Sequence, residues 1–338
     1  MRVDTIYLAG CASVLPARME ADEAVRQGLC EPSIPRETKI TSVTVSDGAS
    51  GPEMAAQAAR EAIADSGCAT SDVALVLHAS LHYQGHDLWS SSAFVQREAV
   101  GSDCSAMDVG QMSNGGMAAL ELAVSWLMGR GGRPAALLTA GDRFCLPVVD
   151  RWRTDPGTVL ADGGSALVLS RSGGFARLLC CVSTMDSELE FMHRGHDAFG
   201  EVPFSHRTPV DLGVPAKAST SDVGMKYILS RLAAGQREAI TRALAEADLT
   251  LPKITWFVLP HLGWPRLRMA FFHPHGIEPE RSTWSWARTV GHLGAGDQFA
   301  GLAHLRRSGL LKAGDICALL GVGTGFTWSC AIIEATGE

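Results

Sequence analysis

The sequence predicts an α/β fold. Continuous apolar runs typical of buried strands alternate with segments whose apolar residues have helical spacing, and this helix-then-strand order recurs along the 338 residues. Such runs are typical of sheets that helices cover on both faces. Two helix-plus-strand units, near Ala55 and near Lys226, look like the same piece used twice. The sequence therefore predicts an internally duplicated architecture.

The individual elements follow from apolar spacing and from glycine stops. Each predicted helix is amphipathic and leads into an apolar run short enough for a buried strand. In chain order, the predictions are a strand at 5–10, a helix at 55–67 with a strand at 73–80, a helix at 116–132 with a strand at 135–142, a helix at 227–249 with a strand at 254–261, and a last helix and strand within 297–325.

Composition and charge narrow the class of protein. With 46% hydrophobic and 19% charged residues, the chain can bury a sizeable core, and its length suggests about two domain-sized units. The formal net charge of −7 offers no basic surface for nucleic acid or an anionic membrane. No segment is apolar over the length of a membrane span, and nine cysteines without a C-x-x-C pair favour reduced thiols and a cytoplasmic protein. The expected partners are small molecules or other proteins.

The stretch DVGQMSNGGMAALELA, residues 108–123, contains a candidate nucleophile. A short apolar stretch, small residues and then a helix place Ser113 at a helix amino terminus, where N–H groups favour developing negative charge. Serine and asparagine also commonly cap helices, so the local sequence alone favours a capping role for Ser113 or Asn114. A nucleophilic serine further needs a base, because its hydroxyl is barely ionised at neutral pH.

Two of the eleven histidines stand at positions typical of a site. His261 directly follows a buried strand, and the carboxyl end of a strand is where α/β proteins usually build sites. His292 lies in a glycine-rich turn, with Asp297 five positions later at the start of the next helix. A carboxylate there can hold an imidazole in the tautomer that a base needs. Taken singly, each histidine could be structural and Asp297 could be a helix cap.

Five motifs taken together identify a protein family more specifically than any of these single residues does. They are MDVGQMSNGG, TVLADGGSALVLS, VLPHLGWPRL, GHLGAGDQFAGLAHL and the closing GVGTGFTWSCAIIE. In this order the chain resembles the β-ketoacyl-acyl carrier protein synthase III branch of the thiolase superfamily. The resemblance implies a thiolase fold with two related halves in α-β-α-β-α layers and a homodimer. The halves are expected at 1–172, with the nucleophile, and at 173–338, with the histidines and the closing glycine-rich turn.

The resemblance also implies roles for single residues. Ser113 stands at the family's nucleophilic cysteine, His261 at its first histidine, and His292 where the family has an asparagine. Backbone N–H groups of Ser113 and of the turn near Thr324 would form an oxyanion hole. Ordinary members use cysteine, histidine and asparagine to load an acyl group and decarboxylate a malonyl extender. This sequence has neither that cysteine nor that asparagine, so its reaction is expected to differ from that of ordinary members.

A Ser113–His292–Asp297 triad is consistent with these replacements, because a serine needs stronger base assistance than a cysteine. Similar serine-containing proteins are acyltransferase and starter-unit members of polyketide-type antibiotic pathways. The prediction is acyl transfer through an acyl-serine to a second carrier protein, or to a small-molecule hydroxyl or amine. Three alternatives stay open: a starter-selecting condensing enzyme, a non-catalytic partner subunit, and an active enzyme in which His261 is the base.

The donor is expected to carry its acyl group on phosphopantetheine, and no other cofactor is expected. Similar proteins hold the adenine of coenzyme A between an early tryptophan and an arginine in a D-R-G-T turn. Here the early stretch GLCEPSIPRETKIT has no tryptophan, and Pro156 stands in the arginine's place. These differences favour an acyl carrier protein as donor, with acyl-CoA as the alternative. The arginines that could meet an acidic carrier are Arg151, Arg153, Arg266 and Arg268.

The acyl pocket has five candidate residues. His82, Tyr83 and His86 lie in HASLHYQGHDLWSS, the region that lines the acyl pocket in similar proteins. His193 and His196 lie in the polar stretch 192–217, which reads as a surface loop or a lid. No metal is predicted, because no carboxylate or cysteine stands at ligand spacing near these histidines.

Overall fold

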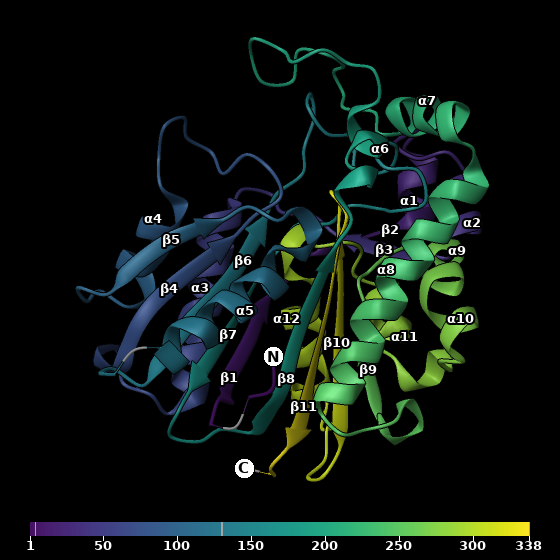
Figure 1. Cartoon of the computed structure of the whole chain (residues 1–338). Helices are drawn as coiled ribbons and strands as arrows, with labels where there is room; N and C mark the ends of the chain where they lie inside the picture. Colours follow the sequence, from purple (N-terminus) through teal and green to yellow (C-terminus); the bar gives the residue numbers. More distant parts are fainter. Residues whose placement is uncertain (4, 130, 338) are drawn as a thin grey trace.

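The computed structural model describes residues 1–3, 5–129 and 131–337, and it confirms the predicted α/β class. Nine strands form one hydrogen-bonded sheet in the order β5-β4-β6-β7-β1-β8-β11-β10-β9 (Figure 1). These strands are β1 (Tyr7–Val14), β4 (Val73–Ala79), β5 (Ser105–Val109), β6 (Ala135–Asp142), β7 (Gly163–Ser170), β8 (Ala176–Met185), β9 (Trp256–Val258), β10 (Ile316–Gly323) and β11 (Thr327–Ala335).

Four long helices pack against this sheet, and shorter elements surround its ends. The long helices are α3 (Gly51–Ser66), α5 (Gly115–Gly129), α8 (Met225–Glu246) and α12 (Asp297–Arg307). The other helices are α1 (Ala21–Arg26), α2 (Ser33–Thr38), α4 (Ser91–Ala99), α6 (Phe191–Arg194), α7 (Gly213–Val223), α9 (Trp264–Leu267), α10 (His273–His275) and α11 (Trp284–Ala287). Strands β2 (Arg18–Glu20) and β3 (Ser42–Thr44) form a separate ribbon. None of the helices in the described ranges is both long and apolar enough to cross a membrane.

The strand order shows the predicted duplication. Outward from the β1/β8 junction, it runs β1-β7-β6-β4 on one side and β8-β11-β10-β9 on the other. On both sides the first two pairings are antiparallel and the third is parallel. Helix α3 packs on β1 and β7, and α8 packs on the equivalent β8 and β11. The predicted boundary between residues 172 and 173 falls in the connection from β7 to β8, and it stays a prediction.

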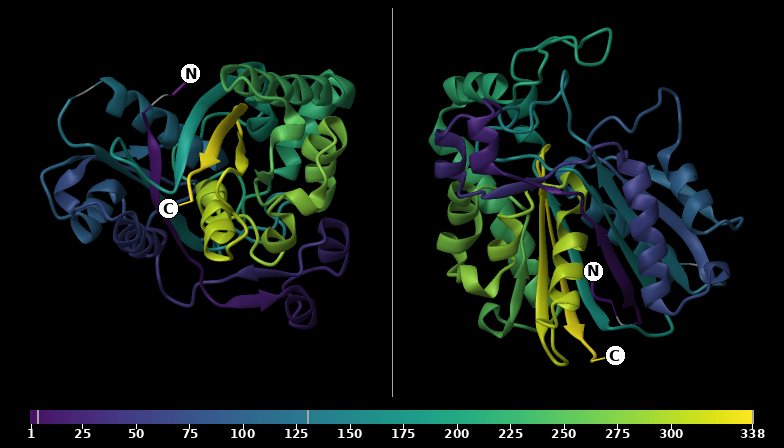
Figure 2. Two further views of the ribbon diagram at one scale, coloured as in Figure 1. Left: turned by 90° about the horizontal axis from the view of Figure 1, so that it is seen from below. Right: turned by 180° about the vertical axis from the view of Figure 1, so that it is seen from behind.

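Three apolar cores define five layers. The central core joins inward side chains of both halves of the sheet, such as Leu138 and Leu319, with Leu120 of α5 and Leu302 of α12. The outer face of the first half packs against α3, and the outer face of the second half packs against α8. Figure 1 shows α8 outside β8 and β11, and the view from behind in Figure 2 shows α3 over the other half. The order is therefore α-β-α-β-α, as predicted.

Helix α3 shows how local chemistry fixes an element and its packing. The Ser50 hydroxyl accepts from the N–H of Glu53, and the Glu53 side chain accepts from the N–H of Ser50, so the helix starts four residues before the predicted Ala55. Its buried face is rich in alanine, which lets the sheet approach closely. A Cβ on Gly164 of β7 would come within 2.3 Å of the backbone of Met54, so only glycine allows this contact.

Two segments behave in ways that the sequence did not predict or left open. Residues 18–44 belong to the first half in sequence, but Ala24, Cys30 and Ile40 pack into the core of the second half. The polar stretch 192–217 forms the end of α6, an exposed loop and the start of α7, and the loop projects at the top of Figure 1. Phe204 of this loop contacts the His82 ring, with the centroids 5.5 Å apart.

All nine cysteines are free thiols.

Candidate active site

Ser113 lies where strand β5 turns into helix α5. Val109 ends β5, and one 3-10 turn, Met112–Asn114, leads into α5 at Gly115. Met112 has a φ of 50°, a left-handed conformation that costs a non-glycine residue about 1 kcal/mol. This bend presents Ser113 at the amino end of α5, where backbone N–H groups have no acceptors within the helix.

The Ser113 hydroxyl bonds to a histidine and does not cap the helix. Its oxygen lies 2.8 Å from Nε2 of His292, and Nδ1 of His292 lies 2.6 Å from Oδ2 of Asp297. An ionised carboxylate only accepts hydrogen bonds, so Nδ1 carries the ring proton and Nε2 accepts from the hydroxyl. The capping role that the local sequence favoured for Ser113 is therefore wrong. Ser113, His292 and Asp297 lie in one hydrogen-bonded chain with the polarity that a nucleophile, base and orienter need.

Asp297 is held rigidly at the start of α12. Its side chain is buried, Oδ2 accepts the N–H of His261 at 2.7 Å, and Oδ1 accepts the N–H of Leu293 at 2.8 Å. Burial alone would raise the pKa of Asp297, but its contacts with His261 and His292 hold that pKa below its usual value. An ionised carboxylate fixed by several donors keeps the His292 ring in one orientation.

His261 contacts Asp297, and within the described residues no hydrogen bond joins it to Ser113. Its Nδ1 lies 2.8 Å from the Gly291 carbonyl oxygen and 3.3 Å from Oδ1 of Asp297, so Nδ1 carries the ring proton. Its Nε2 is buried without a hydrogen-bond partner among these residues. Burial lowers the pKa of His261 although Asp297 lies close. This geometry favours a positioning role for His261 over the role of base.

The protonation of His292 should set the pH dependence of the first chemical step. Burial alone would lower the pKa of His292, but the charge and hydrogen bond of Asp297, with smaller contributions from Asp155 and Asp142, raise it above 6.5. Only the neutral ring can accept a proton from Ser113. We therefore expect the rate of serine acylation to rise with pH through a limb above pH 6.5 and then to level off. Rapid-quench acylation rates across this range test the expectation, and a limb at or below pH 6.5 would contradict it.

The turn after β10 lies against the nucleophile turn. A Cβ on Gly323 would come within 2.7 Å of the Gln111 carbonyl oxygen and 2.8 Å of the Asn114 nitrogen, so a side chain there would force the turns apart. Thr324 follows Gly323 directly, and within the described residues its N–H has no main-chain acceptor. These contacts bring the turns of Ser113 and Thr324 together, and their role as an oxyanion hole stays a prediction.

Two of the predicted pocket residues lie against aromatic rings. His82 is half-buried, with ring centroids 5.9 Å from Phe144 and 5.5 Å from Phe204. The ring centroid of His193 lies 5.6 Å from that of Phe326, which follows Thr324 by two residues. Burial lowers the pKa of both histidines, which favours their neutral forms. His82 and His193 remain candidates for contact with an acyl group.

The other three predicted pocket residues face solvent. Tyr83 and His86 are exposed, and the His86 ring lies edge-on to Trp89 at 5.2 Å. His196 is exposed and lies 3.0 Å from a carboxylate oxygen of Asp222. No contact among the described residues joins these three side chains to the triad. The single chain therefore does not gather the five residues into one pocket.

Most of the arginines proposed to meet a carrier have acidic partners within the chain. The pairs are Arg151 with Asp162, Arg153 with Asp150 and Glu31, and Arg266 with Asp155. The Arg151 side chain is only 12% exposed, so the expectation for this residue is wrong. Arg268 is exposed, and it is the remaining candidate that has no ion pair within the described residues.

The sequence reasoning missed Asp142. This residue ends β6, is buried, and accepts N–H groups of Leu81 and His82. Its negative charge also raises the pKa of His292. An acidic residue at the carboxyl end of an apolar strand was the available signal, by the same rule that selected His261.

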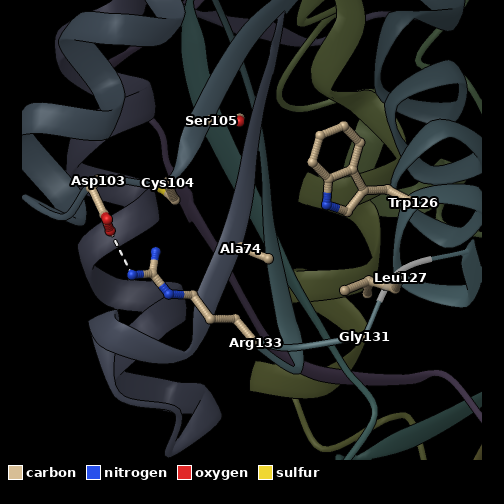
Figure 3. A pocket seen from close by; sticks show the side chains of 8 residues that line it. All are labelled: Ala74, Asp103, Cys104, Ser105, Trp126, Leu127, Gly131 and Arg133. Atoms are coloured by element: carbon tan, nitrogen blue, oxygen red, sulfur yellow. Dashed lines mark hydrogen bonds and ion pairs between the residues drawn. The ribbon is translucent and has the colours of Figure 1, made fainter.

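The pocket in Figure 3 lies away from the triad. It is lined by the starts of β4 and β5 and by the carboxyl end of α5, with an ion pair between Arg133 and Asp103 on one side and Trp126 on the other. A second hollow lies between α3 and α12 and is lined by Asp65 and Arg306. Neither contains a triad residue. In the described ranges, no group of three or more His, Cys, Asp or Glu side chains is arranged to hold a metal ion.

Known proteins resemble this chain in sequence and in structure. A family model for the 3-oxoacyl-[acyl-carrier-protein (ACP)] synthase III C terminal matches residues 244–335. A β-ketoacyl-[acyl-carrier-protein] synthase III from Rhizorhabdus wittichii is 28% identical over 331 residues, which are 96% of this chain and 98% of the relative. The solved structure of ChlB3, described as an acyltransferase, is 32% identical, has a TM-score of 0.91, and matches over 98% of both chains.

The same fold occurs in a more distant protein. OleA from Xanthomonas campestris has a TM-score of 0.76 at 21% identity over 99% of both chains, so this likeness is one of fold. The match to ChlB3 spans nearly the whole chain, and the family model covers the segment with His261, His292 and Asp297. The five-layer duplicated fold and these matches lead to one conclusion: the chain belongs to the β-ketoacyl-[acyl-carrier-protein] synthase III-like family of the thiolase superfamily.

Proposed function

We propose that this protein is an acyltransferase of polyketide-type secondary metabolism. It takes an acyl group from a thioester onto Ser113 and passes it to a second carrier protein, or to a hydroxyl or amine of a small molecule, without decarboxylation. The observation that carries the proposal is the hydrogen-bonded chain from Ser113 through His292 to the buried Asp297. The description of ChlB3 as an acyltransferase supports it.

The first half-reaction forms the acyl-serine. Nε2 of His292 takes the hydroxyl proton while the Ser113 oxygen bonds to the thioester carbonyl carbon. The resulting imidazolium is stabilised by Asp297 at 2.6 Å, and N–H groups near Ser113 and Thr324 would hold the oxyanion. When the intermediate collapses, the carbon–sulfur bond breaks and the departing sulfur takes the proton from His292.

The second half-reaction uses the same groups in reverse. His292 takes a proton from the acceptor hydroxyl, amine or thiol, and the acceptor atom bonds to the acyl carbon. The bond from the acyl carbon to the Ser113 oxygen then breaks, and that oxygen recovers a proton from His292. In each half-reaction, the His292 nitrogen that accepts the proton also returns it to the leaving atom. The protons therefore balance without a further cofactor.

The condensing reaction is the second candidate, and the names of the curated relatives favour it. Decarboxylation of a malonyl group needs hydrogen-bond donors at the enolate oxygen. The neutral His261 ring carries its proton on Nδ1, bonded to Gly291, which leaves Nε2 as an acceptor. Nε2 of His292 likewise accepts from Ser113. While both rings are neutral, neither Nε2 can donate to an enolate oxygen, which supports transfer over condensation.

The contacts of Arg266 bear on the form of the donor. Its two terminal nitrogens donate to the Asp155 carboxylate at 2.8 and 2.7 Å, to the Thr158 hydroxyl at 2.7 Å and to the Pro156 carbonyl at 2.5 Å. All four terminal N–H groups thus have acceptors, and none is left for a nucleotide phosphate. The same contacts leave none for an acidic carrier, so the expectation of a carrier protein as donor rests on the missing early tryptophan and on Pro156 in the arginine's place. The exposed β5 edge of the sheet is compatible with the expected homodimer, which stays a prediction.

Two acceptors distinguish transfer from condensation. The wild-type protein is loaded with one acyl group and offered either a holo carrier protein or the same carrier bearing labelled malonate. We expect the holo carrier to gain the acyl mass, and we expect no labelled carbon dioxide and no 3-oxoacyl product from the malonyl carrier. Intact-mass spectrometry of the carriers and trapping of carbon dioxide measure these outcomes.

The donor is varied in parallel, with the same acyl group on a carrier protein and on coenzyme A. Faster loading from the carrier is the expected result. Carbon dioxide release with a 3-oxoacyl product would favour the condensing enzyme, and a strong preference for coenzyme A would contradict the expectation of a carrier protein as donor. If no donor loads the protein, the non-catalytic subunit becomes the better description.

A further inference from the structure

Asp142 is a buried carboxylate beside the triad that has no cationic partner among the described residues. Its side chain is completely buried at the end of β6. In place of a cation, Oδ1 accepts the N–H of Leu81 at 2.9 Å and the N–H of His82 at 2.8 Å. Burying an ionisable group without a counter-charge is costly. Both oxygens of Asp142 accept N–H groups, which an ionised carboxylate can do and an amide cannot.

The other carboxylate oxygen, Oδ2, accepts the N–H of Leu81 at 3.0 Å and also faces the turn that carries the triad. The N–H of Ala295 lies 3.4 Å from Oδ2 of Asp142. A Cβ on Gly294 would come within 2.2 Å of the same oxygen, so the glycine lets this turn lie directly against the carboxylate. Gly294 and Ala295 stand between His292 and Asp297 in the chain, so Asp142 touches the segment that sets their geometry.

A directed chain of hydrogen bonds holds the neighbouring turn, residues 81–84. Nε2 of Gln84 donates to the carbonyl oxygens of His82 at 3.0 Å and Gly141 at 3.1 Å, so Oε1 of Gln84 faces Nε2 of His78 at 3.1 Å. His78 must then donate from Nε2, and its Nδ1 accepts from the Thr139 hydroxyl at 2.9 Å. His78 in β4 and Thr139 in β6 are both buried, so these hydrogen bonds fix the 81–84 turn against which the Asp142 carboxylate lies.

We propose that Asp142 is a positioning residue for acyl transfer. It holds the His292–Asp297 turn against the 81–84 turn, and it places a negative charge where His292 becomes an imidazolium. The inference rests on the proposed function, because His292 gains this charge only when it takes the proton of Ser113.

Electrostatics explain why a carboxylate suits this position. Burial raises the pKa of Asp142 to about 7, against the opposing effect of the N–H groups of His82 and Leu81, and a charged His292 favours the ionised form. By reciprocity, an ionised Asp142 favours the imidazolium form of His292. In a buried site this attraction is screened far less than in water.

The substitution Asp142→Asn tests the proposal. The pKa of His292, measured by NMR titration of its ring, should fall, because one of its negative neighbours is lost while Asp297 and Asp155 remain. The acylation rate at saturating donor should fall about tenfold with little change in the donor KM. Thermal unfolding of the variant verifies that it is folded.

Asp108→Asn is the matched control. Asp108 accepts the Ser91 hydroxyl at 2.6 Å and the N–H of Ser92 at 2.9 Å, but it is not among the charges that act on His292. We expect no change in the pKa of His292 in this variant. If Asp142→Asn leaves either that pKa or the acylation rate unchanged, the proposal is overturned. The titration needs no donor, so a wild-type protein that never acylates would count against the proposed function alone.

Discussion

Replacement of Ser113 by alanine should abolish the acyl-enzyme. The wild-type protein, incubated with a panel of acyl carrier proteins and acyl-CoAs, should gain the mass of one acyl group, and Ser113→Ala should gain none. The substitution removes the oxygen that lies 2.8 Å from Nε2 of His292 and that attacks the thioester. Loss of a nucleophile within a triad typically lowers the rate by about 10⁴-fold or more. Intact-protein mass spectrometry measures the effect, and the size of the gain identifies the acyl group.

Ser113→Cys is the matched control for this experiment. It keeps a nucleophile at the same position and restores the residue that ordinary members of the family carry, so it should still acylate. Thermal unfolding of all three proteins verifies that the alanine variant is folded. Acylation of Ser113→Ala at the wild-type rate would rule out Ser113 as the nucleophile. A wild-type protein that gains no mass from any donor would support a non-catalytic role.

His292→Ala should impair acylation far more than His261→Ala. His292 is the ring that bonds to Ser113, and loss of the base of a triad lowers kcat by about 10⁴-fold or more. His261 bonds to Asp297 and Gly291, so its loss shifts the orienting carboxylate and should cost about 10²-fold at most. Single-turnover acylation rates of the two variants, measured with one donor at one pH, make the comparison.

Rescue by free imidazole distinguishes a lost base from a damaged site. Added imidazole can fill the space left in His292→Ala and accept the serine proton, so part of the rate should return. His261→Ala should show no comparable recovery, because in the part of the chain that the structure describes its ring makes no hydrogen bond with Ser113. A larger loss at His261 than at His292, or rescue of the His261 variant alone, would identify His261 as the base.

The success of the sequence predictions depended on how local each signal was. Strand β6 was predicted at 135–142 and is observed at Ala135–Asp142, because a mostly apolar run that begins after Pro134 and ends at Asp142 marks both limits. Helix α3 ends at Ser66 before Gly67, as the glycine stop predicted, but its start depends on a capping box that the apolar spacing did not reveal. The packing of residues 18–44 on the second half had no local signal.

The sequence by itself determined the α/β class, the duplicated helix-plus-strand units and the pairing of His292 with Asp297, since each depends on residues close together in the chain. Only the tertiary structure decided which group Ser113 contacts, what His261 does, and that Asp142 matters. Ser113 meets His292 across 179 positions, and Asp142 meets Ala295 across 153. A hydrogen bond requires its two heavy atoms to lie within about 3 Å, and over such separations the packing of the five layers alone sets that distance.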